Sequence, residues 1–176
     1  MKKHGVWLIL GGLFLVEGTL MEWLIPESWQ TRLYVTPHFV LVVILYLSVF
    51  VNRYYGLGAG LALGFLQDVI YYGHALGVYS FAMGISAYAV GLSVRRSPQQ
   101  LFVALRLIAT GNILYDLLLF GIYRFFLRVT TVDFQWMLTN QLLPSLLINM
   151  LFALAVYVPV RNLLEHMAVL VRHDED

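Results

Sequence analysis

Long apolar runs separated by short polar breaks are the feature that most constrains this chain. Hydrophobic residues make up 60% of its 176 residues and charged residues only 12%, and the mean hydropathy is +0.77. Because a helix needs about 20 mostly apolar residues to cross a bilayer, the runs predict an all-α polytopic membrane protein with about six transmembrane helices. We expect one integral membrane domain over residues 1–176, with helices at about 5–23, 37–51, 56–72, 76–93, 101–123 and 136–160 and a cytoplasmic tail at 161–176.

The basic residues between the apolar runs predict the orientation of the chain. If the N-terminus is cytoplasmic, seven basic residues lie inside (Lys2, Lys3, Arg53, Arg95, Arg96, Arg161 and Arg172) and three lie outside (Arg32, Arg124 and Arg128). This asymmetry and an even number of spans place both termini in the cytoplasm. We therefore expect a multi-pass membrane protein, N-in and C-in.

Several classes of function find no support in the sequence. The net charge of +1 and the lack of a Lys/Arg run leave no basic surface for nucleic acid. The chain has no Cys, its five His are scattered, and it contains no HExxH, no GxSxG and no phosphate-binding loop. We expect no enzymatic activity, no metal site and no cofactor.

Polar side chains inside the apolar runs are the first candidates for function, because hydrocarbon offers them no hydrogen-bond partner. At a rise of about 1.5 Å per residue, the three acids among them fall at similar depths in the outer half of the membrane. The candidate intramembrane polar cluster comprises Glu17, His38, Gln67, Asp68, Asn112 and Asp116. It forms either an outward-opening polar pocket or relay, or a hydrogen-bonded brace that fixes helix order. In the brace, the acids are expected either to pair with Arg32 or Arg124 or to be partly protonated.

Small residues recur at helical spacing in the third and fourth expected helices, and Asp68 continues the first of these rows. The candidate helix-packing stripe comprises Gly56, Gly60, Gly64, Gly77, Ser80, Gly84, Ala87 and Gly91. Such stripes allow two membrane helices to approach closely. We expect the two helices to pack as a hairpin; the alternative is a surface that binds another protein.

One block of the sequence resembles a known family. The segment Gly60-Leu61-Ala62-Leu63-Gly64-Phe65-Leu66-Gln67-Asp68, followed by Leu76-Gly77-Val78-Tyr79, resembles the GxxxGxxxD and LG-aromatic core of the MreD family, bacterial rod shape-determining membrane proteins. Glu17, Pro37 and the stretch 144–149 are also similar to that family. The resemblance covers essentially the whole chain, and the block in helices three and four is its specific part.

The resemblance implies a non-enzymatic scaffold of the elongation machinery, which maintains rod cell shape and side-wall peptidoglycan synthesis. It implies MreC as a partner, and MreB, RodA and a class B penicillin-binding protein as members of the same complex in the lipid bilayer. It also implies a fold resembling the S component of energy-coupling-factor transporters. The alternative function is therefore a small-molecule-binding transport subunit. Against that alternative, the sequence shows no long outer loop to serve as a lid, and acids suit cationic ligands better than most vitamins.

Overall fold

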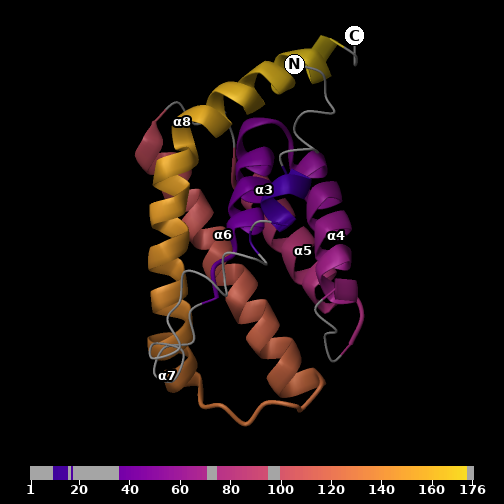
Figure 1. Cartoon of the computed structure of the whole chain (residues 1–176), viewed down its shortest axis with the longest axis vertical. Helices are drawn as coiled ribbons and strands as arrows, with labels where there is room; N and C mark the ends of the chain where they lie inside the picture. The colour runs from indigo at the N-terminus through magenta and orange to yellow at the C-terminus, as the bar shows by residue number, and fades with distance from the viewer. Residues whose placement is uncertain (1–9, 16, 18–35, 71–74, 95–99, 174–176) are drawn as a thin grey trace.

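The described part of the chain is helical, without a β-strand. The computed structural model describes residues 10–15, 17, 36–70, 75–94 and 100–173, of which 10–15 and 17 belong to a helix. The later elements are α3 (Phe39–Phe50), α4 (Arg53–Ile70), α5 (Val78–Ser93), α6 (Leu101–Gly121), the π-helical η1 (Ile122–Phe126), α7 (Phe134–Met137), the π-helical η2 (Leu138–Leu142) and α8 (Leu143–His173). Figure 1 shows a bundle of helices in which α7 and the end of α6 lie at one end and the last turns of α8 at the other. The all-α prediction is confirmed.

The 12-residue helix α3 forms the centre of the bundle. Every residue from Val40 to Phe50 is buried, and α3 contacts α4, α5, α6 and α8, which also contact one another in the order α4, α5, α6, α8. A helix that is apolar on all sides is stable only when it is surrounded. Leu10 and Phe14 of the first helical segment belong to the same hydrophobic core.

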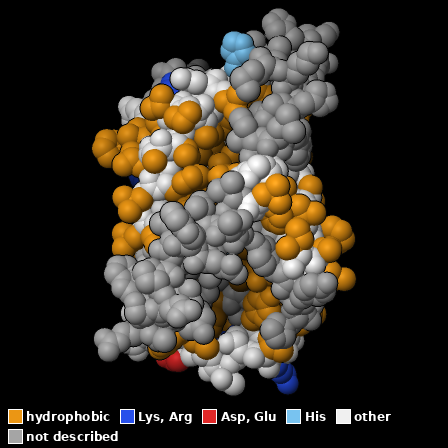
Figure 2. All heavy atoms as spheres, viewed as in Figure 1, with side chains coloured by type: hydrophobic (Ala, Val, Ile, Leu, Met, Phe, Trp, Pro, Cys, Tyr) orange, Lys and Arg blue, Asp and Glu red, His pale blue; other side chains and the backbone are white. Residues whose placement is uncertain are grey.

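The outward faces of the surrounding helices are apolar. On α8, the exposed residues Leu147, Leu151, Leu154 and Val158 follow helical spacing. Figure 2 shows hydrophobic side chains over much of the described part of the visible face. Two helical segments, Leu101–Phe126 and Phe134–Leu164, are long and apolar enough to cross a membrane. Such a surface suits lipid as its solvent, because a helix facing water places polar residues outward.

The starts of α3 and α4 differ from the predicted positions, because side chains hydrogen-bond to the backbone N–H groups at or before the start of each helix. The turn predicted at 52–55 is shorter and lies at residues 51–52. α4 begins at Arg53, and Asn52 acts as its N-cap, since the Asn52 Oδ1 accepts a 3.2 Å hydrogen bond from the Tyr54 N–H. In contrast, α3 begins at Phe39, two residues later than predicted. The expected helix 5–23 lies largely outside the described residues.

The last helix is longer than the predicted span at 136–160. Helical structure continues from Phe134 to His173, so the expected tail is helical over 161–173. Figure 1 shows that α8 bends in its upper part, and Pro159 lies inside the helix; a proline removes one backbone hydrogen bond and kinks a helix. Leu164 and Met167 after the bend are buried in the core.

Candidate functional site

Three side chains from other helices hold the backbone where the chain enters α3. The Thr36 N–H donates to Ser145 Oγ (3.0 Å), and the His38 N–H donates to Asn149 Oδ1 (2.8 Å). The Val40 N–H donates to the Glu17 carboxylate (2.8 Å). The first N–H groups of a helix have no partner within the helix, so these contacts satisfy donors that would otherwise be buried without an acceptor. The contacts of Thr36 and His38 hold these residues in the non-helical segment before α3, which begins at Phe39 and not at the predicted position 37.

A pair of buried amides links α6 to α8 behind this segment. The Asn149 Nδ2 donates to the Asn112 Oδ1 (2.9 Å), and the Asn112 Nδ2 donates to the Ile108 carbonyl of its own helix (2.9 Å). Both amides are fully buried. Asn149 therefore connects α6 to the start of α3 through one side chain.

Asp68 accepts hydrogen bonds from the backbone at the start of α5, as Glu17 does at the start of α3. Its two carboxylate oxygens accept hydrogen bonds from the N–H groups of Tyr79 (3.1 Å) and Ser80 (3.0 Å), both in the first turn of α5. The carboxylate also lies at the positive end of the α5 dipole. Asp68 is an N-terminal cap supplied by a neighbouring helix.

Asp116 differs from the other two acids. It is buried, and the His38 Nε2 is 3.7 Å from its Oδ1, which is an ion-pair distance but too long for a hydrogen bond. Among the residues that the structure describes, no hydrogen bond reaches this carboxylate. The His38 ring is held in place by an edge-on contact with Tyr115, with ring centroids 4.8 Å apart.

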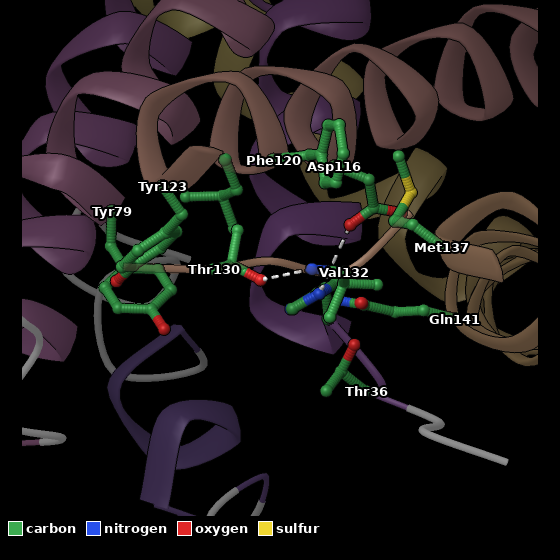
Figure 3. Close-up of a pocket in the computed structure, with 11 residues that line it drawn as sticks. Thr36, Tyr79, Asp116, Phe120, Tyr123, Thr130, Val132, Met137 and Gln141 are labelled. Atoms are coloured by element: carbon green, nitrogen blue, oxygen red, sulfur yellow. Dashed lines mark hydrogen bonds and ion pairs between the residues drawn. The ribbon is translucent and has the colours of Figure 1, made fainter. Parts of the chain in front are cut away.

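A cavity of about 210 Å³ lies in front of Asp116. Figure 3 shows Tyr79 and Tyr123 side by side at one part of its wall, and the hydrogen bond from the Val132 N–H to the Thr130 hydroxyl at another. Thr36, His38, Tyr79, Asp116, Leu119, Phe120, Tyr123, Thr130, Val132, Met137 and Gln141 line the cavity. Its wall therefore combines one carboxylate with hydroxyl, imidazole, amide and aromatic groups.

The small-residue stripe lies mainly between α4 and α5. A Cβ added at Gly60 would be 2.9 Å from the Gly84 backbone, and one added at Gly64 would be 2.5 Å from the Ser80 Cα. Since a backbone atom cannot swing aside as a side-chain tip can, both positions require glycine. The Ser80 Oγ also donates to the Leu61 carbonyl (2.8 Å).

The other stripe residues have different neighbours. Gly56 faces Ser48 of α3, and Gly91 faces the Arg53 Cα and Cβ at the other end of the hairpin. Gly77 precedes α5 with a φ of 95°, which glycine adopts readily, and nothing lies within 4 Å of its added Cβ. Ala87 is buried in the core.

Comparison with known proteins identifies the family. The model of the family described as "rod shape-determining protein MreD" matches residues 1–167. The chain belongs to the MreD family. A rod shape-determining protein MreD of Bacillus subtilis (strain 168) is 25% identical over 125 residues, which cover 71% of this chain and 72% of the relative. No solved structure matches the chain.

In this MreD-family chain the residues of the predicted polar cluster have different roles in the structure. Glu17 and Asp68 cap two helices, while His38 and Asp116 face each other at the cavity. Asn112 is connected to this pair through Asn149, and Gln67 is buried next to Asp68 in sequence. The acids thus occupy the end of the bundle where α3 and α5 begin, but they do not form one continuous hydrogen-bonded chain among the described residues.

Two aspects of the site differ from the sequence expectation. The expected basic partner Arg124 donates to the Val132 carbonyl, and Arg32 lies outside the described residues. Ser145 and Asn149 are functional hydrogen-bond partners that were not included among the candidates, although they lie in the 144–149 stretch that resembles the MreD family. Among the described residues, no group of three His, Asp or Glu side chains is arranged to hold a metal ion.

Proposed function

We propose that this protein is a non-enzymatic membrane scaffold of the bacterial elongation machinery. In this role it maintains rod shape and side-wall peptidoglycan synthesis by binding MreC, in a complex that also contains MreB, RodA and a class B penicillin-binding protein. The observation that carries the proposal is the match of the rod shape-determining MreD family model to residues 1–167. We further propose a multi-pass arrangement with both termini in the cytoplasm, as the basic residues of the sequence predict.

The polar contacts support a scaffold more than a proton relay. A relay needs titratable groups connected to one another, whereas Glu17 and Asp68 each accept hydrogen bonds from backbone N–H groups at a helix start. Such contacts stabilise one arrangement of helices. A fixed arrangement presents constant surfaces to partner proteins, which is what a scaffold requires.

The cavity in front of Asp116 is the part of the scaffold that we propose contacts a partner. Its carboxylate lies 3.7 Å from the His38 Nε2 and accepts no hydrogen bond from the described residues. Because it faces the cavity, a partner segment that supplies an N–H, ammonium or guanidinium group gains a charge-assisted hydrogen bond there. The surrounding hydroxyl and aromatic side chains suit a short peptide segment.

Purification from the native host in mild detergent tests the scaffold proposal. Affinity-tagged protein should co-purify with MreC and with cell-wall synthesis proteins, and its depletion should turn rod-shaped cells into spheres with less label from fluorescent D-amino acids in the side wall. Recovery of transporter ATPases in place of MreC, together with unchanged cell shape, would instead support the small-molecule transport subunit, for which the cavity would be the substrate site.

A further inference from the structure

The Asp116 cavity presents one carboxylate in a largely enclosed space. The Asp116 side chain is 6% exposed and accepts no hydrogen bond from the described residues, and it lines a cavity of about 210 Å³. A cation that enters the cavity gains a charge-assisted hydrogen bond with this group, and its positive charge in turn favours the ionised form of the carboxyl. The carboxylate therefore selects a ligand that carries positive charge.

The rest of the lining consists of apolar and oxygen-bearing side chains. The apolar side chains are those of Leu119, Phe120, Val132 and Met137. Side-chain oxygen atoms come from Thr36, Tyr79, Tyr123, Thr130 and Gln141. Figure 3 shows Asp116 and Gln141 at one part of this wall and Tyr79 and Tyr123 at another. A ligand that fits the wall therefore carries its charge on an apolar chain.

The volume of the cavity limits the length of that chain. In another protein, an apolar cavity of about 150 Å³ holds a benzene molecule. At about 210 Å³, the Asp116 cavity has room for an ammonium group on a short alkyl chain. The n-butylammonium ion is such a ligand, and it has the same atoms as a lysine side chain beyond the Cα.

The surroundings of the carboxylate favour an ammonium over a guanidinium. The His38 Nε2 lies 3.7 Å from the Asp116 Oδ1, and the His38 ring is held by its edge-on contact with Tyr115. A guanidinium pairs with a carboxylate through two parallel hydrogen bonds that use both oxygens, whereas an ammonium is a compact charge that needs only one. Because the imidazole lies next to Oδ1, the single contact of an ammonium with Oδ2 suits this carboxylate better.

Aromatic rings in the wall also suit a cation. Phe120, Tyr79 and Tyr123 belong to the lining, and a cation over the face of an aromatic ring is attracted by its π electrons. The Arg124 guanidinium already lies 5.7 Å from the centre of the Phe120 ring. Arg124 does not serve Asp116, since it donates to the Val132 carbonyl, and within the described part of the chain the ion-pair contact of Asp116 is with His38.

We propose that the Asp116 cavity is a binding site for a primary alkylammonium group, with the Asp116 carboxylate as its counter-ion. Two sources share this chemistry: a lysine side chain of a partner protein and a free small amine. The site rests on the proposed function only for the first source, and ammonium binding is measured on the isolated protein. A failure of ammonium binding and a failure to recover MreC are therefore separate results.

Thermal unfolding of the protein in detergent tests the site with two cations of equal charge. The n-butylammonium ion has N–H donors on a short chain, whereas the tetramethylammonium ion has no N–H. Both are added as chlorides at the same concentrations. Because a ligand that binds only the folded state raises the melting temperature as its concentration rises, the parent protein should be stabilised by butylammonium and not by tetramethylammonium.

Two variants then locate the binding. Asp116→Asn should need about tenfold more butylammonium for the same rise in melting temperature, because it replaces a charge-assisted hydrogen bond by a weaker neutral one. Asp133→Asn is the matched control, since it removes an exposed carboxylate that lies outside the cavity lining. This control should respond to butylammonium as the parent does.

Three results would overturn the ammonium site. The first is an equal rise in melting temperature with butylammonium and tetramethylammonium in the parent protein. The second is the same response to butylammonium in Asp116→Asn and Asp133→Asn. The third is a larger rise with n-propylguanidinium than with butylammonium, which would assign the cavity to a guanidinium. The comparison of cations in the parent needs no variant, so it decides the question if Asp116→Asn fails to fold.

Co-purification from the native host identifies the source of the ammonium. If butylammonium lowers the recovery of MreC and tetramethylammonium does not, a lysine of the partner occupies the cavity. If the recovery of MreC is unchanged while butylammonium stabilises the isolated protein, the ligand is a free amine. Both results uphold the ammonium site, and the second would remove the cavity from the contact with MreC.

Discussion

Ser80 on α5 lies beside Asp68 on α4 and donates two hydrogen bonds to that helix. The Ser80 N–H donates to the Asp68 carboxylate (3.0 Å), and the Ser80 hydroxyl donates to the Leu61 carbonyl of α4 (2.8 Å). At the same position the Ser80 backbone lies so close to Gly64 that no Cβ would fit. The end of the hairpin is therefore fixed by hydrogen bonds and by close packing at one residue.

The first prediction concerns the cap formed by Asp68. Asp68→Leu removes both acceptors and leaves two N–H groups at the start of α5 unpaired, at about 1–3 kcal/mol each; Asp68→Asn retains one acceptor oxygen. We expect the melting temperature in detergent to fall strongly with Leu and about half as much with Asn. The exposed Asp133→Asn is the control. A melting temperature of Asp68→Leu equal to that of the control would contradict the cap.

The second prediction concerns the close approach of α4 and α5. Gly60→Ala should destabilise the protein by about 1–3 kcal/mol, because the new Cβ would meet the Gly84 backbone. Gly58→Ala on the same helix is a matched control: nothing lies within 4 Å of its added Cβ, and alanine favours a helix by about 0.8–1 kcal/mol over glycine. Thermal unfolding of both variants measures the difference, and equal melting temperatures would show that the two helices can separate at no cost.

The third prediction concerns the entry to α3. Asn149→Ala removes the acceptor of the His38 N–H and the donor to Asn112, so hydrogen–deuterium exchange should accelerate in peptides that cover 36–42. Asn162→Ala, at an exposed position on the same helix, should leave this exchange unchanged. If the exchange rate of residues 36–42 is the same in the two variants, Asn149 does not hold the start of α3.

The fourth prediction separates Asp116 from Asp68 by function. Because the Asp116 carboxylate accepts no hydrogen bond from the described residues, Asp116→Asn should maintain or raise the melting temperature. The same variant should reduce co-purification of MreC about tenfold, since it removes the charge from a charge-assisted contact. A fall in melting temperature as large as that of Asp68→Leu, with MreC capture unchanged, would assign Asp116 to the brace.

Spacing in the sequence predicts the hairpin well but predicts its ends less well. A step of four residues advances a helix by about 40° beyond one full turn, so a row of glycines drifts around the helix axis. Gly60 and Gly64 still face α5, whereas Gly56 has rotated toward Ser48 of α3. The glycine row that appears continuous in the sequence therefore packs against two different helices, α5 and α3.

Residue counting also predicts the common depth of the acids but not their partners. The partner of Glu17 is the Val40 N–H, which is unpaired only because α3 begins at Phe39. That start depends in turn on Ser145 and Asn149, more than 100 positions later in the chain. Pairing that depends on distant residues is not visible in local patterns.

The cavity shows the same limit. The stretch around residues 124–135 reads as a short polar connection and offers no sign of a cavity wall. It contributes Thr130 and Val132 to the cavity lining, and it contains Arg128 in a left-handed conformation and the hydrogen bond from Arg124 to Val132. Neither feature follows from composition or periodicity.

The central position of α3 has a consequence for biosynthesis. At about 1.5 Å per residue, its 12 residues reach about 18 Å, which is less than the roughly 30 Å thickness of the hydrocarbon layer. The donors just before it stay without Ser145 and Asn149 until α8 has left the ribosome. A nascent chain that ends before α8 therefore has a central helix that is short and incompletely hydrogen-bonded, so the bundle closes only after α8 has been synthesised.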